Sequence, residues 1–270
     1  MNLTLTILGC SSSGGVPRVG GSDPSQGWGA CDPENPKNRR RRCSILLTLT
    51  GSSGTTFCVV DTGPDFREQM IAAAVPRIDG VVYTHEHADH IHGIDDLRPF
   101  ALIQRERIKA HMDETTFARA FEGFAYCFET PTGSSYPPIA DRQVIDHERD
   151  IIVSGPGGDI TLTPIPVVHG ESRALGLRIG NVLYLPDVSA IPEKSLPMLN
   201  GLDCLILDAL RYKPHVSHFN VEQAVAVHEQ VQPKRTVLTN LHIDLDYETL
   251  NAETPEAVEP AYDGLKILIG

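Results

Sequence analysis

Length, composition and charge already exclude several classes of protein. The chain has 270 residues, 41% of them hydrophobic, and no apolar run approaches the roughly 18 residues of a membrane-spanning helix, so we expect no membrane association. Its formal net charge of −12 argues against binding of long nucleic acid, because such binding depends on many Lys and Arg side chains.

The length fits a single domain covering residues 1–270. The first residues alternate like a strand and contain no basic segment ahead of an apolar stretch, so we expect no signal peptide and a cytoplasmic location. The six cysteines form no CxxC pair, and we expect them to be reduced thiols.

Strand-like runs dominate the chain, and helical periodicity is confined to three segments. In the first half, the expected strands cover residues 3–8, 44–50, 56–61 and 80–84, and the expected helices cover 65–74 and 112–124. In the second half, the expected strands cover 151–153, 159–168, 175–179, 182–185, 204–208, 235–240 and 265–269, with one helix at 220–230. Two halves of similar content, about 1–150 and 151–270, predict an α/β fold with two sheets face to face and helices outside.

Two segments lack clear periodicity. Residues 11–42 are rich in Gly, Pro, Ser and Asn, and residues 129–141 are rich in Pro. Long loops in a compact domain are either functional or simple connections, and the sequence leaves both readings open.

The most specific pattern in the chain is an apolar strand that runs into three histidines and an aspartate. Val81-Val82-Tyr83-Thr84 is followed by His85-Glu86-His87-Ala88-Asp89-His90. Burying so many titratable groups would be expensive unless a cation neutralised them, and the alternative is a solvated loop. His85 and His87 can point to one side of an extended segment, while Asp89 and His90 follow at the turn. Imidazole and carboxylate donors suit Zn, Mn or Fe, and the pattern offers two pairs of ligands for two metals.

Further candidate ligands stand alone at the ends of later apolar strands. They are His169, Asp187 and His242. Because α/β sheets place their sites at the carboxyl ends of strands, we expect these side chains to complete the metal centre.

The core His-x-His-x-Asp-His, with a later His, Asp and His, resembles the metallo-β-lactamase superfamily across nearly the whole chain. The resemblance implies a four-layer αβ/βα sandwich with a dinuclear site at one edge, holding zinc in the first instance and manganese as the alternative. The ligands that it implies are His85, His87 and His169 for one metal, Asp89, His90 and His242 for the other, and Asp187 as the bridge. Asp61, at a strand end, matches an aspartate of the superfamily that contacts the metal ligands rather than the metals.

Three segments narrow the resemblance to a phosphodiesterase branch that includes tRNase Z and the cyclic phosphate phosphodiesterase PhnP. They are LGCSSSGGVP at 8–17, DTGPDFR at 61–67 and HFNVEQA at 218–224. The branch implies hydrolysis of a small cyclic phosphate or nucleotide-like phosphodiester by a hydroxide between the metals, with Asp89 holding that hydroxide. His218 matches a histidine that meets the substrate phosphate, and His215 is the alternative.

The basic run Arg39–Arg42 can be read in two ways. Either it is a solvated face, or one or two of its guanidinium groups, with Arg41 and Arg42 as the candidates, reach the substrate phosphate.

The chain differs from the known members of this branch in ways that leave its substrate unassigned. PhnP carries an additional zinc held by three cysteines in its first long loop and a later histidine, whereas this loop offers only Cys31, and Leu245 stands at the histidine position. No long tRNA-gripping arm is evident either. The alternatives are a thioester or lactone hydrolase of the glyoxalase II or lactonase type, and a non-catalytic nucleotide-binding metalloprotein. The oligomeric state is open, with a homodimer as one option.

Overall fold

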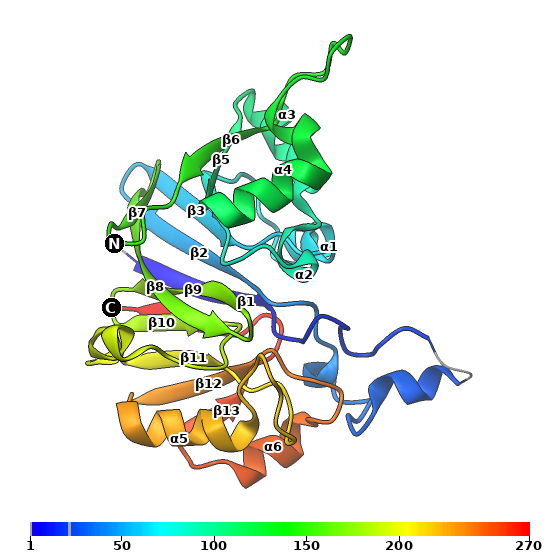
Figure 1. The fold of residues 1–270 in the computed structure, drawn as a ribbon, viewed down its shortest axis with the longest axis vertical. Coiled ribbons are helices and arrows are strands. Elements are labelled where there is room, and N and C mark those ends of the chain that lie inside the picture. Colours follow the sequence, from blue (N-terminus) through cyan, green and yellow to red (C-terminus); the bar gives the residue numbers. More distant parts are fainter. Residues whose placement is uncertain (1, 21–22) are drawn as a thin grey trace.

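Two sheets packed face to face form the centre of the molecule (Figure 1). The structure is a computed structural model that describes residues 2–20 and 23–270, and within these residues each sheet has seven strands. The first sheet runs in the order β14 (Lys266–Ile269), β1 (Asn2–Gly9), β2 (Ser44–Gly51), β3 (Gly54–Val60), β4 (Gly80–Val82), β5 (Ile108–Met112) and β6 (Ala140–Val144). The second runs in the order β13 (Val258–Pro260), β12 (Arg235–Thr239), β11 (Cys204–Asp208), β10 (Val182–Leu185), β9 (Ser172–Ile179), β8 (Gly158–His169) and β7 (Ile151–Gly155).

Helices cover the outer face of each sheet (Figure 1). On the first sheet lie α1 (Phe66–Ala72), α2 (Ala88–Ile91), α3 (Arg98–Gln104) and α4 (Glu114–Phe128). On the second lie α5 (Val221–Val231) and α6 (Tyr247–Glu253). Short 3₁₀ segments occur at η1 (Pro24–Trp28), η2 (Pro36–Asn38), η3 (Ile94–Leu97) and η4 (Glu193–Leu199). The layers confirm the predicted α/β sandwich.

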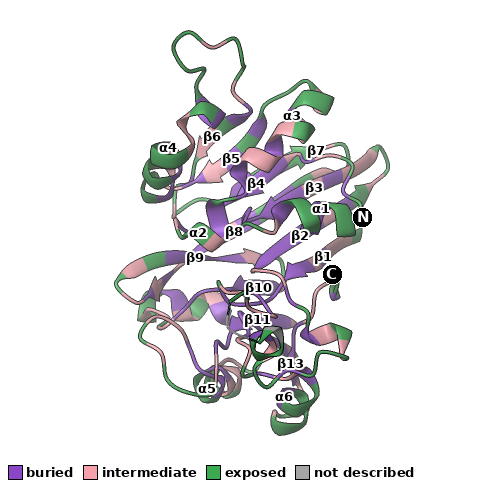
Figure 2. Ribbon diagram, turned by 90° about the vertical axis from the view of Figure 1, so that its right-hand side faces the viewer, coloured by how far each residue is buried: buried purple, intermediate pink, exposed green. Residues whose placement is uncertain are grey.

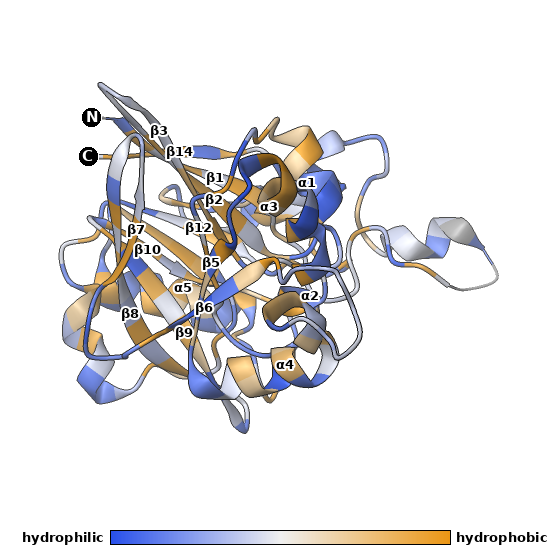
Figure 3. Cartoon of the chain, turned by 90° about the horizontal axis from the view of Figure 1, so that it is seen from above, coloured by the Kyte–Doolittle hydropathy of each residue, from blue (hydrophilic) through white to orange (hydrophobic). Residues whose placement is uncertain are grey.

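Alternation along the strands explains why the layers form. On β2, Ile45, Leu47 and Leu49 face the core between the sheets, whereas Leu46 packs against the helices of the first sheet. A third cluster joins the second sheet to its own helices. The buried strands therefore lie inside, with the exposed faces of the helices outside (Figure 2), and apolar residues concentrate along the strands (Figure 3).

Most predicted elements are present, and the differences have local causes. The helix predicted at 112–124 begins later, because Met112 ends β5 and Asp113 caps α4 by accepting a hydrogen bond from Thr116 N at 2.8 Å. The helix predicted at 220–230 is α5, which opens with a capping box between Asn220 and Gln223. The prediction missed β5, β6, β13, α2, α3 and α6, which are short. The last strand, β14, returns to the first sheet beside β1, and the division at about residue 150 stays a prediction, as does the homodimer.

Among the described residues, no helix combines the length and apolar character that crossing a membrane requires.

A buried arginine fixes the first long loop to the segment before α6. Arg40 is only 2% exposed, and its Nη1 donates to Leu245 O at 2.8 Å while its Nη2 donates to Asn38 Oδ1 at 3.0 Å. Asn38 in turn donates to Asp246 Oδ2 at 2.6 Å and accepts from Tyr247 N at 2.8 Å. These bonds hold residues 38–40 beside the segment that follows His242.

We expect Arg40→Ala to lower the free energy of unfolding by about 2–3 kcal/mol, because it leaves the buried carbonyl of Leu245 without its charged donor. Urea denaturation measures this loss. The control is Arg39→Ala, which removes an exposed side chain that stacks over Trp28. Equal losses in the two variants would contradict the anchoring role of Arg40.

Candidate metal centre and active site

Strand ends from both sheets bring the predicted ligands to one edge of the sandwich. His85 follows β4, His87 precedes the first residue of α2, and His169 is the last residue of β8. Asp187 follows β10, and His242 follows β12. The parallel pairs β3–β4 and β10–β11–β12 point their carboxyl ends the same way, which is why residues far apart in sequence meet here.

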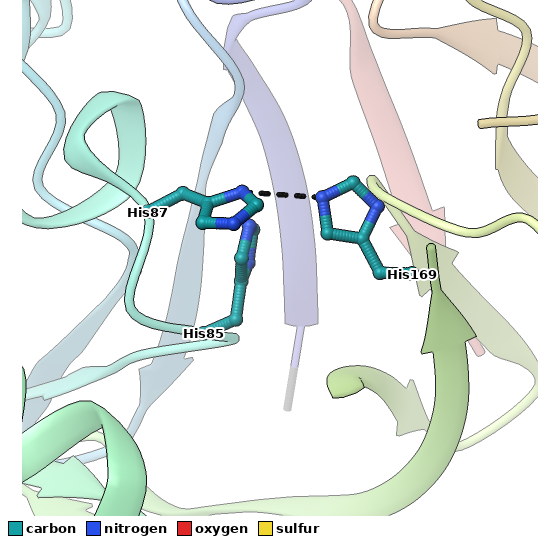
Figure 4. A group of neighbouring side chains, drawn as sticks. All are labelled: His85, His87 and His169. Atoms are coloured by element: carbon teal, nitrogen blue, oxygen red, sulfur yellow. Dashed lines mark hydrogen bonds between the residues drawn. The ribbon is translucent and has the colours of Figure 1, made fainter. Parts of the chain in front are cut away.

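Three imidazoles, two from the segment between β4 and α2 and one from the end of β8, form the first group. The ligand atoms of His85, His87 and His169 lie within 4.8 Å of one another. His87 Nδ1 and His169 Nε2 are 3.2 Å apart, and a dashed line marks this contact in Figure 4. These are the three residues predicted to share one metal.

Asp187 connects this group to a second one. His85, His90 and Asp187 have ligand atoms within 4.8 Å of one another, as do His169, Asp187 and His218. Asp187 Oδ2 lies 3.1 Å from His90 Nε2, and Asp187 Oδ1 lies 3.9 Å from His169 Nε2. One carboxylate thus faces imidazoles of both predicted metal sites, which is the arrangement that a bridging ligand requires.

Hydrogen bonds to the Nδ1 atoms of several histidines leave their Nε2 atoms facing the cluster, where they can act as metal ligands. Asp61 Oδ2 accepts from the hydroxyl of Thr84 at 2.8 Å, so the Thr84 oxygen is left to accept from Nδ1 of His85 at 3.0 Å. His85 Nε2 then keeps its lone pair, and this buried atom has no hydrogen-bond partner among the residues that the structure describes. A divalent cation would satisfy it, so the donor set fits a metal.

His90 and His169 are held in the same way. His90 Nδ1 donates to Asp61 Oδ2 at 2.8 Å, and His169 Nδ1 donates to Ser217 O at 2.7 Å. Each bond leaves Nε2 on the cluster side, where carboxylate or carbonyl support of the outer nitrogen strengthens a metal ligand. Asp61 can reach both His90 and Thr84 because β3 ends at Val60 and Asp61 adopts a left-handed backbone, with φ of 64°.

Electrostatics in the cluster also favour a cation. Burial, followed by the charge of His90, holds the pKa of His85 well below its usual value, so this imidazole is neutral. Burial would also lower the pKa of His90, but the carboxylates of Asp187, Asp61 and Asp89 outweigh burial and raise it. His90 therefore lies where carboxylates attract positive charge, whether a proton or a metal ion.

Asp89 and His242 lie at the rim of the cluster. Both line the same cavity, and Asp89 Oδ2 is 3.7 Å from His90 Nε2. His242 Nδ1 lies 3.2 Å from Asp244 Oδ2, and within residues 2–20 and 23–270 neither Asp89 nor His242 belongs to a group whose ligand atoms all lie within 4.8 Å. Their role in a second metal site stays a prediction.

His218 lies beside Asp187 and is held by a buried carboxylate. Its Nδ1 donates to Asp208 Oδ2 at 2.7 Å, and the same oxygen accepts from Val188 N at 3.0 Å. Burial would lower the pKa of His218, but the hydrogen bond and charge of Asp208 raise it. Because Asp208 occupies Nδ1, Nε2 is the atom left for a substrate.

A cavity of about 260 Å³ opens above these groups. It is lined from the first loop by Ser12, Ser13 and Arg18, and from the segment before α5 by Leu210, Arg211, His215, Ser217 and His218. His215 thus reaches the cavity, with its Nδ1 3.1 Å from Ser217 Oγ. The volume is near the lower end of ligand pockets, which run to about 1,000 Å³, so the cavity suits a small polar ligand.

The structure does not bring Arg41 and Arg42 into this cavity. Arg41 pairs with Asp263 at 2.9 Å and Arg42 with Asp65 at 2.7 Å, and both line a neighbouring hollow instead. The arginines of the cavity are Arg18 and Arg211, which sequence reasoning missed. It also missed Asp208, although this residue ends an apolar strand in the same way as the predicted ligands and could have been found by that signal.

Comparison with known proteins identifies the family. Residues 56–243 match the model of the β-lactamase superfamily domain. The chain therefore belongs to this superfamily.

Within the superfamily, the chain is similar to a diphosphatase of the PhnP family. Its crystal structure superposes with a TM-score of 0.87 at 36% sequence identity, covering 99% of this chain and 97% of the other. The short form of human tRNase Z shares the fold, with a TM-score of 0.64 at 15% identity over 99% of both chains. The predicted resemblance to the PhnP family is confirmed, whereas the similarity to tRNase Z shows a shared fold.

A longer curated protein is also similar. It is an octanoyltransferase of Porphyromonas gingivalis, 29% identical over 266 residues, which make up 97% of this chain. The chain spans about half the length of that relative, 51%.

The ligand assignment predicts a change in metal content. We expect Asp187→Asn to reduce the bound divalent metal from about two ions per chain to one or fewer, because the carboxylate predicted to bridge the metals loses its charge and one donor oxygen. Inductively coupled plasma mass spectrometry after dialysis against zinc measures the ratio.

A matched control is His111→Gln. His111 carries a buried Nε2 without a partner in the described part of the chain, but it lies on β5 and outside the three groups of ligands. This variant should keep the wild-type metal content. Full metal content in Asp187→Asn would contradict the assignment.

Proposed function

We propose that this protein is a dinuclear metal-dependent phosphodiesterase acting on a small phosphate-containing substrate. The observation that carries the proposal is the placement of Asp187 between two groups of imidazoles, with His218 beside it at 3.7 Å. The 36% identity to a PhnP-family diphosphatase over nearly the full length of both chains supports phosphorus as the reacting centre. Zinc is the first choice of metal and manganese the second.

The proposed ligands form the two sets that the sequence predicts, one set for each metal ion. His85, His87 and His169 hold one ion, Asp89, His90 and His242 the other, and Asp187 both. Two such ions, when bound, supply a water of lowered pKa as the nucleophile and polarise the phosphoryl oxygens. Asp61 and Ser217 O keep the imidazoles in the ligating tautomer, and Asp89 accepts a hydrogen bond from the attacking water.

His218 acts on the substrate itself. Asp208 fixes its Nδ1, so its Nε2 can donate either a hydrogen bond to a phosphoryl oxygen or a proton to the leaving oxygen. His215, which lines the same cavity, is the alternative partner of the phosphate.

The cavity limits the substrate to a compact one. Its volume of about 260 Å³ suits a cyclic phosphate, a nucleotide-like diester or a diphosphate, the class named for the PhnP-family relative. The net charge of −12 disfavours long nucleic acid as a substrate.

The rival function is hydrolysis of a thioester or lactone. The similarity to an octanoyltransferase suggests an acyl substrate as the alternative. An eight-carbon chain needs an apolar channel, however, and Leu210 is the one aliphatic side chain among the described residues that line the cavity. The polar lining favours the phosphodiester.

A substrate comparison tests the proposal. With zinc or manganese bound, the protein should hydrolyse bis(p-nitrophenyl) phosphate and leave octanoyl and lactoyl thioesters and simple lactones intact, as release of nitrophenol or thiol measures. Turnover of a thioester or lactone without turnover of the diester would establish the rival function. Inertness toward all substrates with two metals bound, together with tight nucleotide binding, would establish a non-catalytic protein.

The pairing of His218 with Asp208 predicts non-additive kinetics. We expect His218→Ala to lower kcat by about 10²- to 10⁴-fold, and Asp208→Asn to lower it by a smaller factor because the imidazole loses its orientation. The double variant should be no slower than His218→Ala, because Asp208 acts only through His218. Metal content should stay at the wild-type value in all three variants, and multiplicative losses in kcat would contradict the coupling.

A further inference from the structure

Two arginines in the cavity have no acidic partner. Among the described residues, neither Arg18 nor Arg211 has a carboxylate oxygen within 4.0 Å, whereas Arg41 and Arg42 in the neighbouring hollow are both paired. Arg211 is held by carbonyl groups, with Nε donating to Lys213 O at 3.2 Å and Nη2 to Pro214 O at 2.9 Å. The positive charges of Arg18 and Arg211 are thus left for a ligand.

Arg18 is held in place while much of its hydrogen-bonding capacity stays unused. Its backbone N donates to Gly27 O at 2.8 Å, and its Nη2 makes only a long bond of 3.4 Å to Ser12 Oγ. Its Nε is buried and has no hydrogen-bond partner within the described ranges. Because Nε has no exposed surface, the Nη atoms are the donors of Arg18 that a ligand in the cavity can reach.

Gly14 makes room for this side chain. A Cβ on Gly14 would lie 2.6 Å from Arg18 Nε and 3.2 Å from its Cδ. Any larger residue at position 14 must therefore displace the guanidinium group. The loop of residues 11–42 that carries both residues is the one that Arg40 anchors beside the segment after His242 (Figure 1).

Arg18 and His218 occupy different parts of the cavity. Arg18 Nη2 donates to Ser12 Oγ at 3.4 Å, and Ser12 N donates to Leu241 O at 3.3 Å, so Arg18 lies on the side of the cavity next to His242. His218 contacts Asp187 and Asp208 instead. A scissile phosphate held by His218 leaves Arg18 free for another part of the same substrate.

We propose that Arg18, supported by Arg211, is a specificity-determining residue that binds a second phosphoryl group of the substrate. The planar guanidinium fork matches phosphate oxygens, and two cations with two arginines outweigh the carboxylates of Asp89 and Asp187 in the cavity. The inference rests on the proposed function. It narrows the substrate class to phosphodiesters or diphosphates that carry more than one phosphoryl group.

Calorimetric binding of ADP and AMP to the zinc-loaded protein tests the inference without requiring turnover. The two ligands share a nucleoside and differ by one phosphoryl group. We expect the wild-type protein to bind ADP about 10- to 100-fold more tightly than AMP, and Arg18→Gln to bring the ratio of the two dissociation constants close to one. Gly14→Ala should reduce the ratio in the same direction, because the added methyl group displaces the Arg18 side chain.

The control is Arg39→Ala, which removes an exposed arginine of the same loop from the neighbouring hollow and should keep the wild-type ratio. Equal weakening of ADP and AMP in Arg18→Gln would mean that Arg18 holds the first phosphate, and it would overturn the inference. An unchanged ratio would overturn it as well. Failure of the proposed function is a separate result, namely no hydrolysis of bis(p-nitrophenyl) phosphate by the wild-type protein.

Discussion

The carboxylate of Asp187 is only 3% exposed and lies among the imidazoles of His90, His169 and His218. A buried carboxylate without compensation costs several kcal/mol, so these contacts are a condition of the fold as well as of the site. The three histidines come from α2, from the end of β8 and from the segment before α5. Both sheets must therefore be packed before Asp187 is compensated, and the metal centre depends on the same interface that buries the central core.

The site combines a rigid floor with walls made of loops. The floor consists of strand ends whose side chains are oriented from behind by Asp61, Asp208 and the carbonyl of Ser217, so its geometry is fixed by the sheets. The walls come from residues 11–42 and from the segment between β11 and α5. Loops on a fixed scaffold can change without loss of the core, which explains how one superfamily serves different substrates. In this chain, the side chains at the strand ends carry the proposed chemistry, and Arg18 on the first loop carries the proposed substrate selectivity.

Sequence reasoning predicted the fold class and most of the strands, because alternation and apolar runs carry that signal directly. It also singled out the residues that gather at the sheet edge, since His169 and Asp187 each end an apolar strand. It could not predict which side chains of the first loop reach the cavity. Arg18 has no pattern around it that distinguishes it from Arg41 or Arg42, and the anchoring bonds of Arg40 and the pairing of Arg42 with Asp65 decide which guanidinium lines the cavity. Short elements such as α2 and β13 were missed because a few residues carry too little periodicity.

A crystal structure of the zinc-loaded protein with anomalous data at the zinc edge tests the central claim most directly. The account predicts two anomalous peaks in each chain, one among His85, His87 and His169 and one beside His90, with a carboxylate oxygen of Asp187 near each. No peak at this edge of the sheets, or peaks that lie away from Asp187, would contradict it.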